Sequence, residues 1–276
     1  MRTGTASGIQ IAFLSFAVLL LAVPLSAYVA EFLGSSNQYK TFIGRFLPFL
    51  LGAAILAAFP GLRLRVIDLL SLPIPRERRF ELALVALGGV SLALAMAGAL
   101  ALWYWLTEGN AALEQHMKSV PADEQMAQAL SGPGLLTSIL LAVIVGPILE
   151  EILFRGFLYT AWERRWGWLP GMVLSSILFA LYHPHFWAAF TSSVVYTCVF
   201  RRTGSLWGST VAHSFVNLML WYPLLGQFVF PDAERAIGDI HTWGLQLACL
   251  LFVVVALPLY VWLSRKPYAD PLAEPV

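Results

Sequence analysis

Long apolar stretches of membrane-crossing length constrain this chain more than any other feature of its sequence. A helix needs about 20 mostly apolar residues to cross the hydrocarbon core of a bilayer, which is about 30 Å thick. Eight stretches approach or exceed that length: residues 9–30, 42–60, 80–106, 135–162, 168–183, 186–200, 205–225 and 243–264. The sequence therefore predicts an all-α, polytopic membrane helix bundle of about eight transmembrane helices.

The composition excludes several other classes of protein. Apolar residues make up 59% of the chain and charged residues only 12%, about half the charged share of a soluble domain. This balance excludes a disordered chain, a nucleic-acid-binding protein and an ordinary soluble globule. The two cysteines, Cys198 and Cys249, lie inside apolar stretches and suggest neither a disulfide framework nor a metal cluster. Residues 1–276 are predicted to form a single, multi-pass integral membrane domain, in the cell membrane if the host is a bacterium.

Positively charged residues predict the orientation of the bundle. Lys and Arg concentrate in cytoplasmic connections, and 12 of the 17 basic residues fall on one side of the membrane if there are eight spans. These are Arg2, Arg63, Arg65, Arg76, Arg78, Arg79, Arg164, Arg165, Arg201, Arg202, Arg265 and Lys266. Both termini are therefore predicted to be cytoplasmic.

Three details of this organisation carry alternatives. The fifth and sixth stretches are short, which leaves a re-entrant arrangement open, and the first stretch could instead be a signal peptide. The acidic connection over residues 108–133, which contains His116, is predicted to be a solvated connector, with a cover over the site as the alternative. His241 is likewise predicted to lie in a loop.

Three charged residues lie inside the apolar fourth stretch. A charge at bilayer depth costs about 2.5–3.5 kcal/mol, so Glu150, Glu151 and Arg155 need partners or a hydrated cavity. Glu151 and Arg155 are four residues apart with the acid first, which is the favourable order for an ion pair. Glu150 points about 100° away from Glu151 on a helix of 3.6 residues per turn and faces a different neighbour. The preceding Gly146-Pro147 predicts a kink.

Two histidines and an asparagine also lie at the apolar stretches. His183 ends the fifth stretch, while His213 and Asn217 are four residues apart on one face of the seventh. Each alone fits a polar side chain that only holds helices together. Together with Glu150 they make a hydrolytic site, because Glu takes a proton from water, His orients that water, and His and Asn donate to an oxyanion. The carboxylate and the two imidazoles would also suit zinc.

These residues resemble the CPBP family, the CAAX-processing and bacteriocin-processing (ABI) intramembrane endopeptidases. The family's pattern is Glu-Glu-x-x-x-Arg, then Phe-x-x-x-His, then His-x-x-x-Asn, each on its own membrane helix. The three motifs occur here in that order, at residues 150–155, 179–183 and 213–217. The resemblance covers residues 135–220, which are predicted to be the catalytic core helices; the other stretches match only in being hydrophobic.

The resemblance implies a glutamic-type endopeptidase that hydrolyses a peptide bond in a membrane-associated protein or peptide. The family's water-activating glutamate maps to Glu150, and the histidine that helps to position the water maps to His183. The oxyanion-binding His and Asn map to His213 and Asn217.

The resemblance also implies that Glu151 and Arg155 support the site. The family has often been labelled metalloprotease, but the sequence contains no His-Glu-x-x-His run, so we favour a site without a metal or other cofactor. If a metal is bound, the expected ligands are Glu150, His183 and His213.

Two other functions remain open. One is a non-catalytic membrane maturation or immunity factor on the same fold, although the intact motifs argue against it. The other is a proton-coupled transporter that uses Glu150 and His213 as a relay, although no inverted repeat is visible. The expected partners are the lipid bilayer and a membrane-associated substrate, such as a prenylated CAAX tail, a leader peptide or a sorting-signal tail, and not a nucleic acid.

The predicted boundaries leave a mismatch in depth. Counted from the start of each stretch, Glu150 and His183 each lie about 22 Å in, but from opposite faces of the membrane. Across a core of about 30 Å they would differ by roughly 14 Å in depth. Tilted helices, or a fifth helix that begins after Pro170-Gly171, would close this gap.

Overall fold

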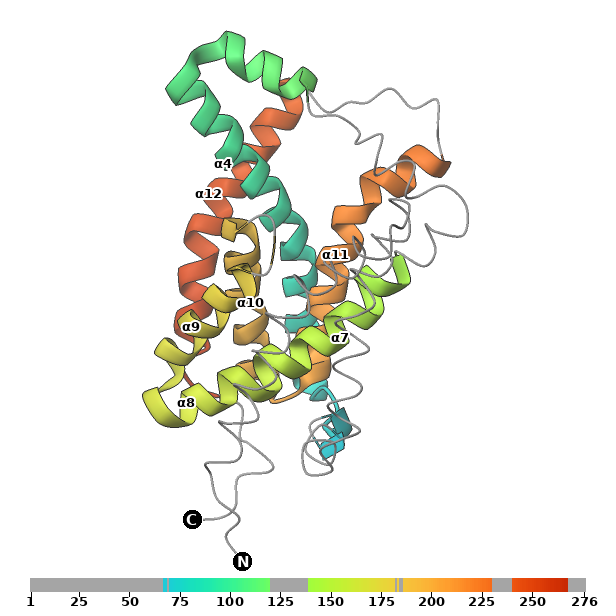
Figure 1. Ribbon diagram of the computed structural model, residues 1–276, viewed down its shortest axis with the longest axis vertical. Helices are drawn as coiled ribbons and strands as arrows, with labels where there is room; N and C mark the ends of the chain where they lie inside the picture. The colour runs from blue at the N-terminus through green and yellow to red at the C-terminus, as the bar shows by residue number, and fades with distance from the viewer. Residues whose placement is uncertain are drawn as a thin grey trace, which may run out of the picture. The chain divides into compact units, whose positions relative to one another are not determined.

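The structure is a computed structural model that describes residues 67–68, 70–119, 139–181, 183, 186–229 and 240–267. Every element within these ranges is helical (Figure 1), so the predicted all-α class is confirmed for this part of the chain. The stretches predicted at residues 9–30 and 42–60 lie outside the described residues. The number of spans and the cytoplasmic termini stay predictions.

The helices follow the predicted stretches with shifted ends. In chain order they are η1 (Arg76–Arg78), α4 (Arg79–Ser119), η2 (Leu140–Val145), α7 (Gly146–Glu151), η3 (Ile152–Tyr159), α8 (Thr160–Trp166), α9 (Trp168–Leu181), α10 (Phe186–Thr203), α11 (Leu206–Val229) and α12 (Ile240–Leu263). The short element η1 is a 3₁₀-helix, whereas η2 and η3 are π-helices. Over residues 140–166, the predicted fourth helix is therefore a continuous helical run whose hydrogen-bond pattern changes from segment to segment.

Two predictions of loops are wrong. Element α4 consists of two helices that meet at a kink at Gly109, which has non-helical torsion angles (φ 82°, ψ −179°), and the second of them ends at Ser119. His116 therefore lies in a helix, because the residues after the glycine, from Ala111 to Gln115, include strong helix formers. His241 lies in the first turn of α12.

Contacts between Cα atoms group the chain into two compact units, each of which we describe by itself. Unit 1 comprises Met1–Pro73, Ile148–Ser193 and Ser205–Trp207. Unit 2 comprises Ile74–Pro147, Val194–Gly204 and Gly208–Val276. The single domain over residues 1–276 stays a prediction.

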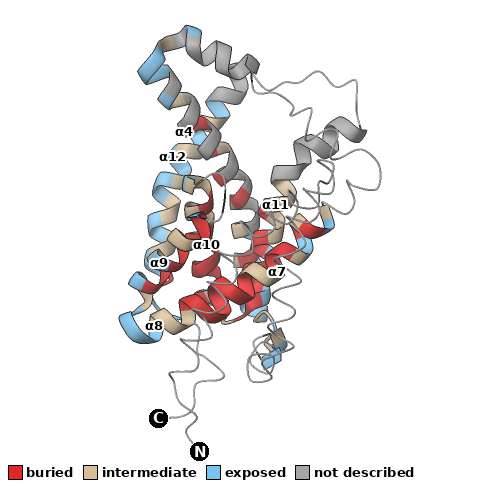
Figure 2. Cartoon of the chain, viewed as in Figure 1, coloured by how far each residue is buried: buried red, intermediate tan, exposed pale blue. Residues whose placement is uncertain are grey.

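Unit 1 is built on a helical hairpin in which α8 and α9 lie side by side (Figure 1). Gly167 makes the turn with φ 90° and ψ 166°, a conformation that essentially only glycine adopts. One turn into α9, a Cβ atom on Gly171 would lie 2.9 Å from the backbone nitrogen of Glu163, so this glycine permits the close approach of the two backbones. Helix α9 also contacts η3, whose eight residues are all buried (Figure 2).

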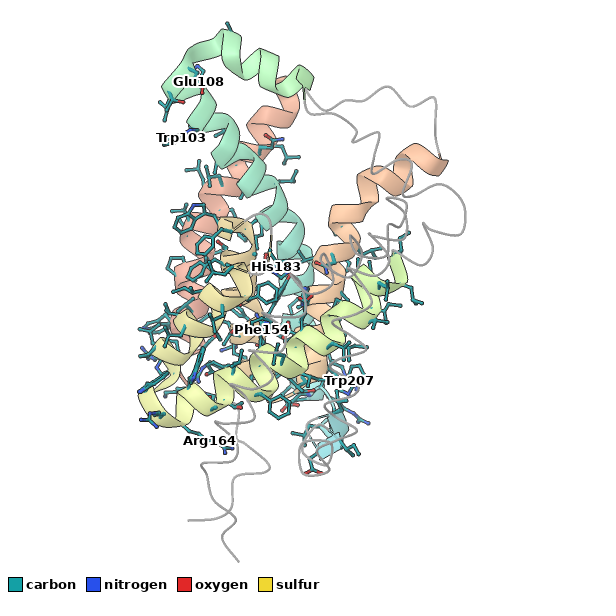
Figure 3. All side chains as sticks on the ribbon, viewed as in Figure 1. Trp103, Glu108, Phe154, Arg164, His183 and Trp207 are labelled. Atoms are coloured by element: carbon teal, nitrogen blue, oxygen red, sulfur yellow. The ribbon has the colours of Figure 1, made fainter. Side chains whose placement is uncertain are left out.

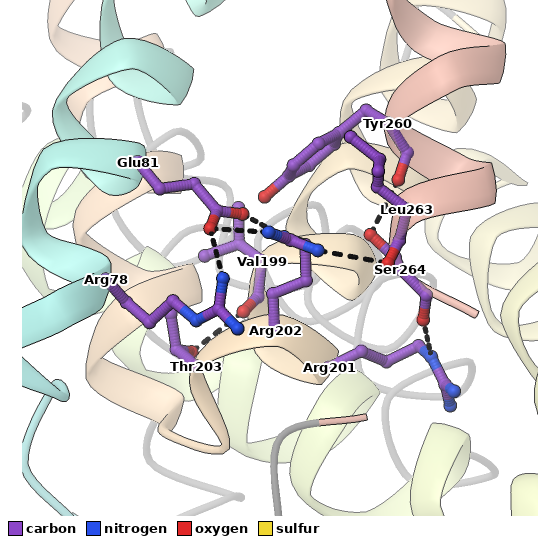
Figure 4. Close-up of polar contacts among 9 residues, drawn as sticks. All are labelled: Arg78, Glu81, Val199, Arg201, Arg202, Thr203, Tyr260, Leu263 and Ser264. Atoms are coloured by element: carbon purple, nitrogen blue, oxygen red, sulfur yellow. Dashed lines mark hydrogen bonds and ion pairs between the residues drawn. The ribbon is translucent and has the colours of Figure 1, made fainter. Parts of the chain in front are cut away.

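Unit 2 is built on the packing of α4 against α12. A polar cluster joins the beginning of α4 to the ends of α10 and α12 (Figure 4). The guanidinium of Arg202 donates to both carboxylate oxygens of Glu81 and to the backbone oxygen of Leu263. Arg201 donates to the backbone oxygen of Ser264 at 2.7 Å. This cluster satisfies the carbonyl groups at the end of α12, which no longer have helical partners.

Helix α12 has the length and apolarity of a membrane span. Among the described residues it is the one helix that is long and apolar enough to cross a membrane. Its segment Gly244–Leu263 has a mean hydropathy of 2.3, and only 6% of its most apolar 18-residue stretch is buried. A core helix of a soluble protein would be mostly buried, whereas α12 exposes Leu251, Phe252, Val255 and Trp262. Exposed apolar side chains of this kind are typical of a surface that contacts a membrane or another protein.

Candidate active site

A fully buried ion pair lies inside the hairpin unit. Arg155 Nη1 donates to Glu151 Oε1 at 2.8 Å, and neither side chain is exposed to solvent. Arg155 Nη2 also donates to the backbone oxygen and the hydroxyl oxygen of Ser193, at 2.9 and 2.7 Å. The ion pair expected from the four-residue spacing is therefore present, and it ties η3 to the beginning of α10.

Glu150 and His183 lie together in the same unit. The distance from Glu150 Oε2 to His183 Nε2 is 3.8 Å, and the two side chains are 21% and 28% exposed. Glu150 thus differs from the adjacent Glu151. The side chain of Glu150 is partly exposed and faces an imidazole with its buried Oε2 atom, whereas the carboxylate of Glu151 is enclosed with a guanidinium. This is the division that the helical geometry of the sequence predicts.

The hairpin explains why these two residues meet. Glu150 precedes the turn at Gly167 by 17 residues, and His183 follows it by 16. At 1.5 Å per helical residue, both lie about 25 Å from the turn, so two arms that fold back on each other bring them to the same level. The mismatch of about 14 Å arose because the depth of Glu150 was counted from the end of its stretch far from the turn, near residue 135, whereas the depth of His183 was counted from the end next to the turn, near residue 168. A later start of the fifth helix is not the explanation, since α9 begins at Trp168.

The ring of His183 is held in a defined orientation. Its Nδ1 atom lies 2.7 Å from the backbone oxygen of Phe179. A carbonyl oxygen only accepts, so Nδ1 carries the hydrogen, and Nε2 of the neutral ring is left as an acceptor that faces Glu150. The ring also stacks on Phe179 with centroids 4.3 Å apart, and Phe154 packs edge-on against the same phenylalanine with centroids 5.0 Å apart. Phe154 and His183 are labelled in Figure 3.

Phe179 links this histidine to the buried ion pair. The guanidinium carbon of Arg155 lies 5.0 Å from the centre of the Phe179 ring, within the range of a cation–π contact. Phe179 is 2% exposed. It therefore separates the charge of Arg155 from the imidazole and supports the ring of His183 at the same time. The family motif includes this phenylalanine, whereas Ser193, which holds Arg155, carries no signal in the sequence beyond being a small polar residue in an apolar stretch.

The other two predicted site residues lie on α11 in unit 2. His213 is 2% exposed, and its ring stacks on Tyr196 with centroids 4.4 Å apart and planes inclined by 18°. Asn217 Nδ2 donates to the backbone oxygen of Ala142 at 2.8 Å. The structure thus brings Glu150 together with His183. Because the two units are described separately, a site that also includes His213 and Asn217 stays a prediction.

Glu150 and His183 are two of the three residues expected to bind a metal ion if the site holds one, and they lie together in unit 1. The described residues contain no group of three or more His, Cys, Asp or Glu residues placed to hold a metal ion. Glu150 and His183 supply two donor atoms, whereas a catalytic zinc site has three protein ligands. The third ligand expected if a metal is bound, His213, lies in unit 2, so the site without a metal stays a prediction.

Comparisons with known proteins agree with the motifs. Residues 132–219 match the family model described as type II CAAX prenyl endopeptidase Rce1-like. The UPF0177 protein YbdI of Lactococcus lactis subsp. lactis (strain IL1403) is 29% identical over 123 residues, which are 41% of this chain and 66% of that protein. The putative membrane peptidase YdiL of Bacillus subtilis (strain 168) is 29% identical over 82 residues, which are 29% of this chain and 34% of that protein.

The matched region of this chain spans about two thirds of the length of the first relative and one third of the second. No solved structure is significantly similar to the chain. The family model covers all three motifs, and its match confirms the family resemblance that these motifs predict.

Proposed function

We propose that this chain, which resembles the CPBP family over the segment that carries its three motifs, is an intramembrane endopeptidase that hydrolyses a peptide bond in a membrane-associated protein or peptide. Glu150 activates the attacking water and His183 positions it. His213 and Asn217 donate to the oxyanion, and Glu151 with Arg155 supports the site. The reaction needs no metal or other cofactor.

The contact between Glu150 and His183 carries this proposal. At 3.8 Å from Nε2 to Oε2, the two atoms are too far apart for a direct hydrogen bond. A separation of this size suits a water molecule that donates one hydrogen to the carboxylate and the other to Nε2. Both side chains are partly exposed, although Glu150 Oε2, the atom that faces Nε2, is itself buried. The adjoining η3 segment is buried as well.

The proposed reaction follows from these positions. The water oxygen attacks the carbonyl carbon of the substrate while Glu150 takes one of its protons, and the carbonyl π electrons move onto the oxygen. Donors on His213 and Asn217 stabilise that oxyanion. When the carbon–nitrogen bond breaks, the protonated Glu150 passes its proton to the departing amine. Stacking on Phe179 and the bond to its carbonyl oxygen keep the imidazole aligned throughout.

Two reporter peptides in lipid nanodiscs test the activity. One ends in a farnesylated CAAX sequence, and the other is the same peptide without the prenyl group. We expect the wild-type chain to cleave the prenylated peptide, and Glu150→Gln, which keeps the shape but not the basicity, to lower kcat by about 10²–10⁴-fold. Glu108→Gln is the matched control, because Glu108 is an exposed acid on α4, and it should leave kcat unchanged.

Two results would contradict the proposal. One is cleavage by Glu150→Gln at the wild-type rate. The other is a folded wild-type chain that cleaves neither peptide, which would favour the non-catalytic alternative.

A further inference from the structure

The hydrogen bond from Asn217 reaches the backbone oxygen of Ala142 in η2, the helical segment that directly precedes the one carrying Glu150. Helix η2 is a π-helix, in which each N–H donates to the carbonyl oxygen five residues earlier. Its last such bond runs from the N–H of Gly146 to the oxygen of Leu141. The next bond in this register would join residue 147 to the oxygen of Ala142.

Residue 147 cannot make that bond. It is Pro147, which has no backbone N–H, and it is among the largest fully buried side chains. The oxygen that the register assigns to it belongs to Ala142, and this is the oxygen to which Asn217 Nδ2 donates at 2.8 Å. The side-chain amide therefore stands in the place of the donor that proline removes.

We propose that Asn217 is a positioning residue that replaces the absent N–H of Pro147 and so fixes the helix that carries Glu150. All three of Asn217, Ala142 and Pro147 belong to unit 2. Helix α7 begins at Gly146 and ends at Glu151, so Glu150 follows Pro147 by three residues, less than one turn, in the same helix. A shift at the proline is thus passed to the carboxylate through continuous helical backbone.

This role is compatible with contact to the substrate. A carboxamide has two N–H hydrogens, of which the bond to Ala142 uses one. The second remains available for the oxyanion. The inference rests on the proposed function only for its effect on activity, since the hydrogen bond itself makes a structural prediction.

Restoring the missing N–H gives a direct test. Four proteins are compared in nanodiscs: wild type, Asn217→Ala, Pro147→Ala and the double variant. Hydrogen exchange of peptides within residues 139–151 is measured together with kcat on the farnesylated reporter. We expect Asn217→Ala to speed exchange in these peptides and to lower kcat by about 100-fold, the order of loss produced by a misplacement of about 1 Å.

The double variant decides between the two roles. Pro147→Ala supplies a backbone N–H, so adding Asn217→Ala to it should change hydrogen exchange in residues 139–151 by less than about threefold, which is within the spread of independent sites. The kcat of the double variant should still be low, because the oxyanion has lost its donor on Asn217. The argument from the backbone N–H also applies to folding: if Asn217→Ala yields no folded protein, the double variant should restore it. Equal effects of Asn217→Ala on hydrogen exchange in both backgrounds, or no restoration of folding, overturn the proposal.

A second set of variants does not depend on Pro147→Ala. Asn217→Asp keeps the shape of the side chain but, when ionised, only accepts hydrogen bonds, and it should speed exchange as much as Asn217→Ala does. Ser214→Ala, on the same helix, is the control and should leave exchange unchanged. Wild-type exchange in Asn217→Asp overturns the proposal. Exchange reports on the hydrogen bond even if no peptide is cleaved, so failure of the positioning role and failure of the proposed function give different results.

Discussion

Removal of the buried guanidinium of Arg155 tests the physical account of the hairpin unit. Arg155→Met keeps a side chain of similar length but leaves Glu151 enclosed, with both side chains of the original pair at 0% exposure. It also removes the donor to the backbone and hydroxyl oxygens of Ser193. The variant therefore strands one charge and two hydrogen-bond acceptors in a region that excludes water.

The size of the effect follows from burial. Breaking a buried ion pair by removing one partner typically costs about 3–5 kcal/mol. For a chain of this size each kcal/mol lowers Tm by about 2–4 °C, so the expected fall is about 6–20 °C. Arg78→Met is the matched control, because Arg78 pairs with Glu81 three residues on at 2.9 Å, but the two side chains are 31% and 21% exposed. Such a pair contributes about 0.2–1 kcal/mol, and Glu81 keeps its bonds to Arg202.

Thermal unfolding in detergent, followed by near-ultraviolet circular dichroism, measures both variants. The double variant Glu151→Gln, Arg155→Met removes both charges and should be more stable than Arg155→Met alone, because the cost lies in the unpaired charge rather than in the lost attraction. Equal Tm values for Arg155→Met and Arg78→Met, or a double variant that is less stable than Arg155→Met, would refute the reasoning.

Two further predictions concern the hairpin and the chemistry. Gly171→Val should lower Tm and reduce cleavage, because its Cβ would lie 2.9 Å from the backbone nitrogen of Glu163 and force α9 away from α8. The control is Gly88→Ala, which should be neutral or stabilising because a Cβ on Gly88 meets nothing within 4 Å. Similar Tm changes for the two variants would contradict this prediction. A metal chelator such as 1,10-phenanthroline should leave cleavage of the reporter unchanged, and a loss of activity that added zinc restores would show that the site uses a metal.

The sequence predicted those features of the site that depend on residue spacing within a single helix. The four-residue spacing of Glu151 and Arg155 placed both on one helix face, and the pair is present. The same helical geometry separated Glu150 from its neighbour. The three motifs identified the family resemblance because their order and spacing are properties of the chain itself.

Long-range features could not be predicted in the same way. The level at which Glu150 meets His183 depends on where the chain reverses, and the turn at Gly167 decides it. The partner of Arg155 on α10, Ser193, lies 38 residues away, and no local pattern marks it. Element α4 extends beyond Gly109, although the acidic composition of that region suggested a loop.

The sequence by itself determined the chemical groups and their spacing along each helix, because residues three or four apart share a helix face whatever surrounds them. It also determined the apolar surfaces, since hydropathy depends on composition alone. Only the tertiary structure decided which carbonyl oxygen accepts the hydrogen bond from the side-chain amide of Asn217 and which imidazole faces Glu150. Those contacts depend on where separate helices cross, and a residue's own neighbours in sequence do not fix that position.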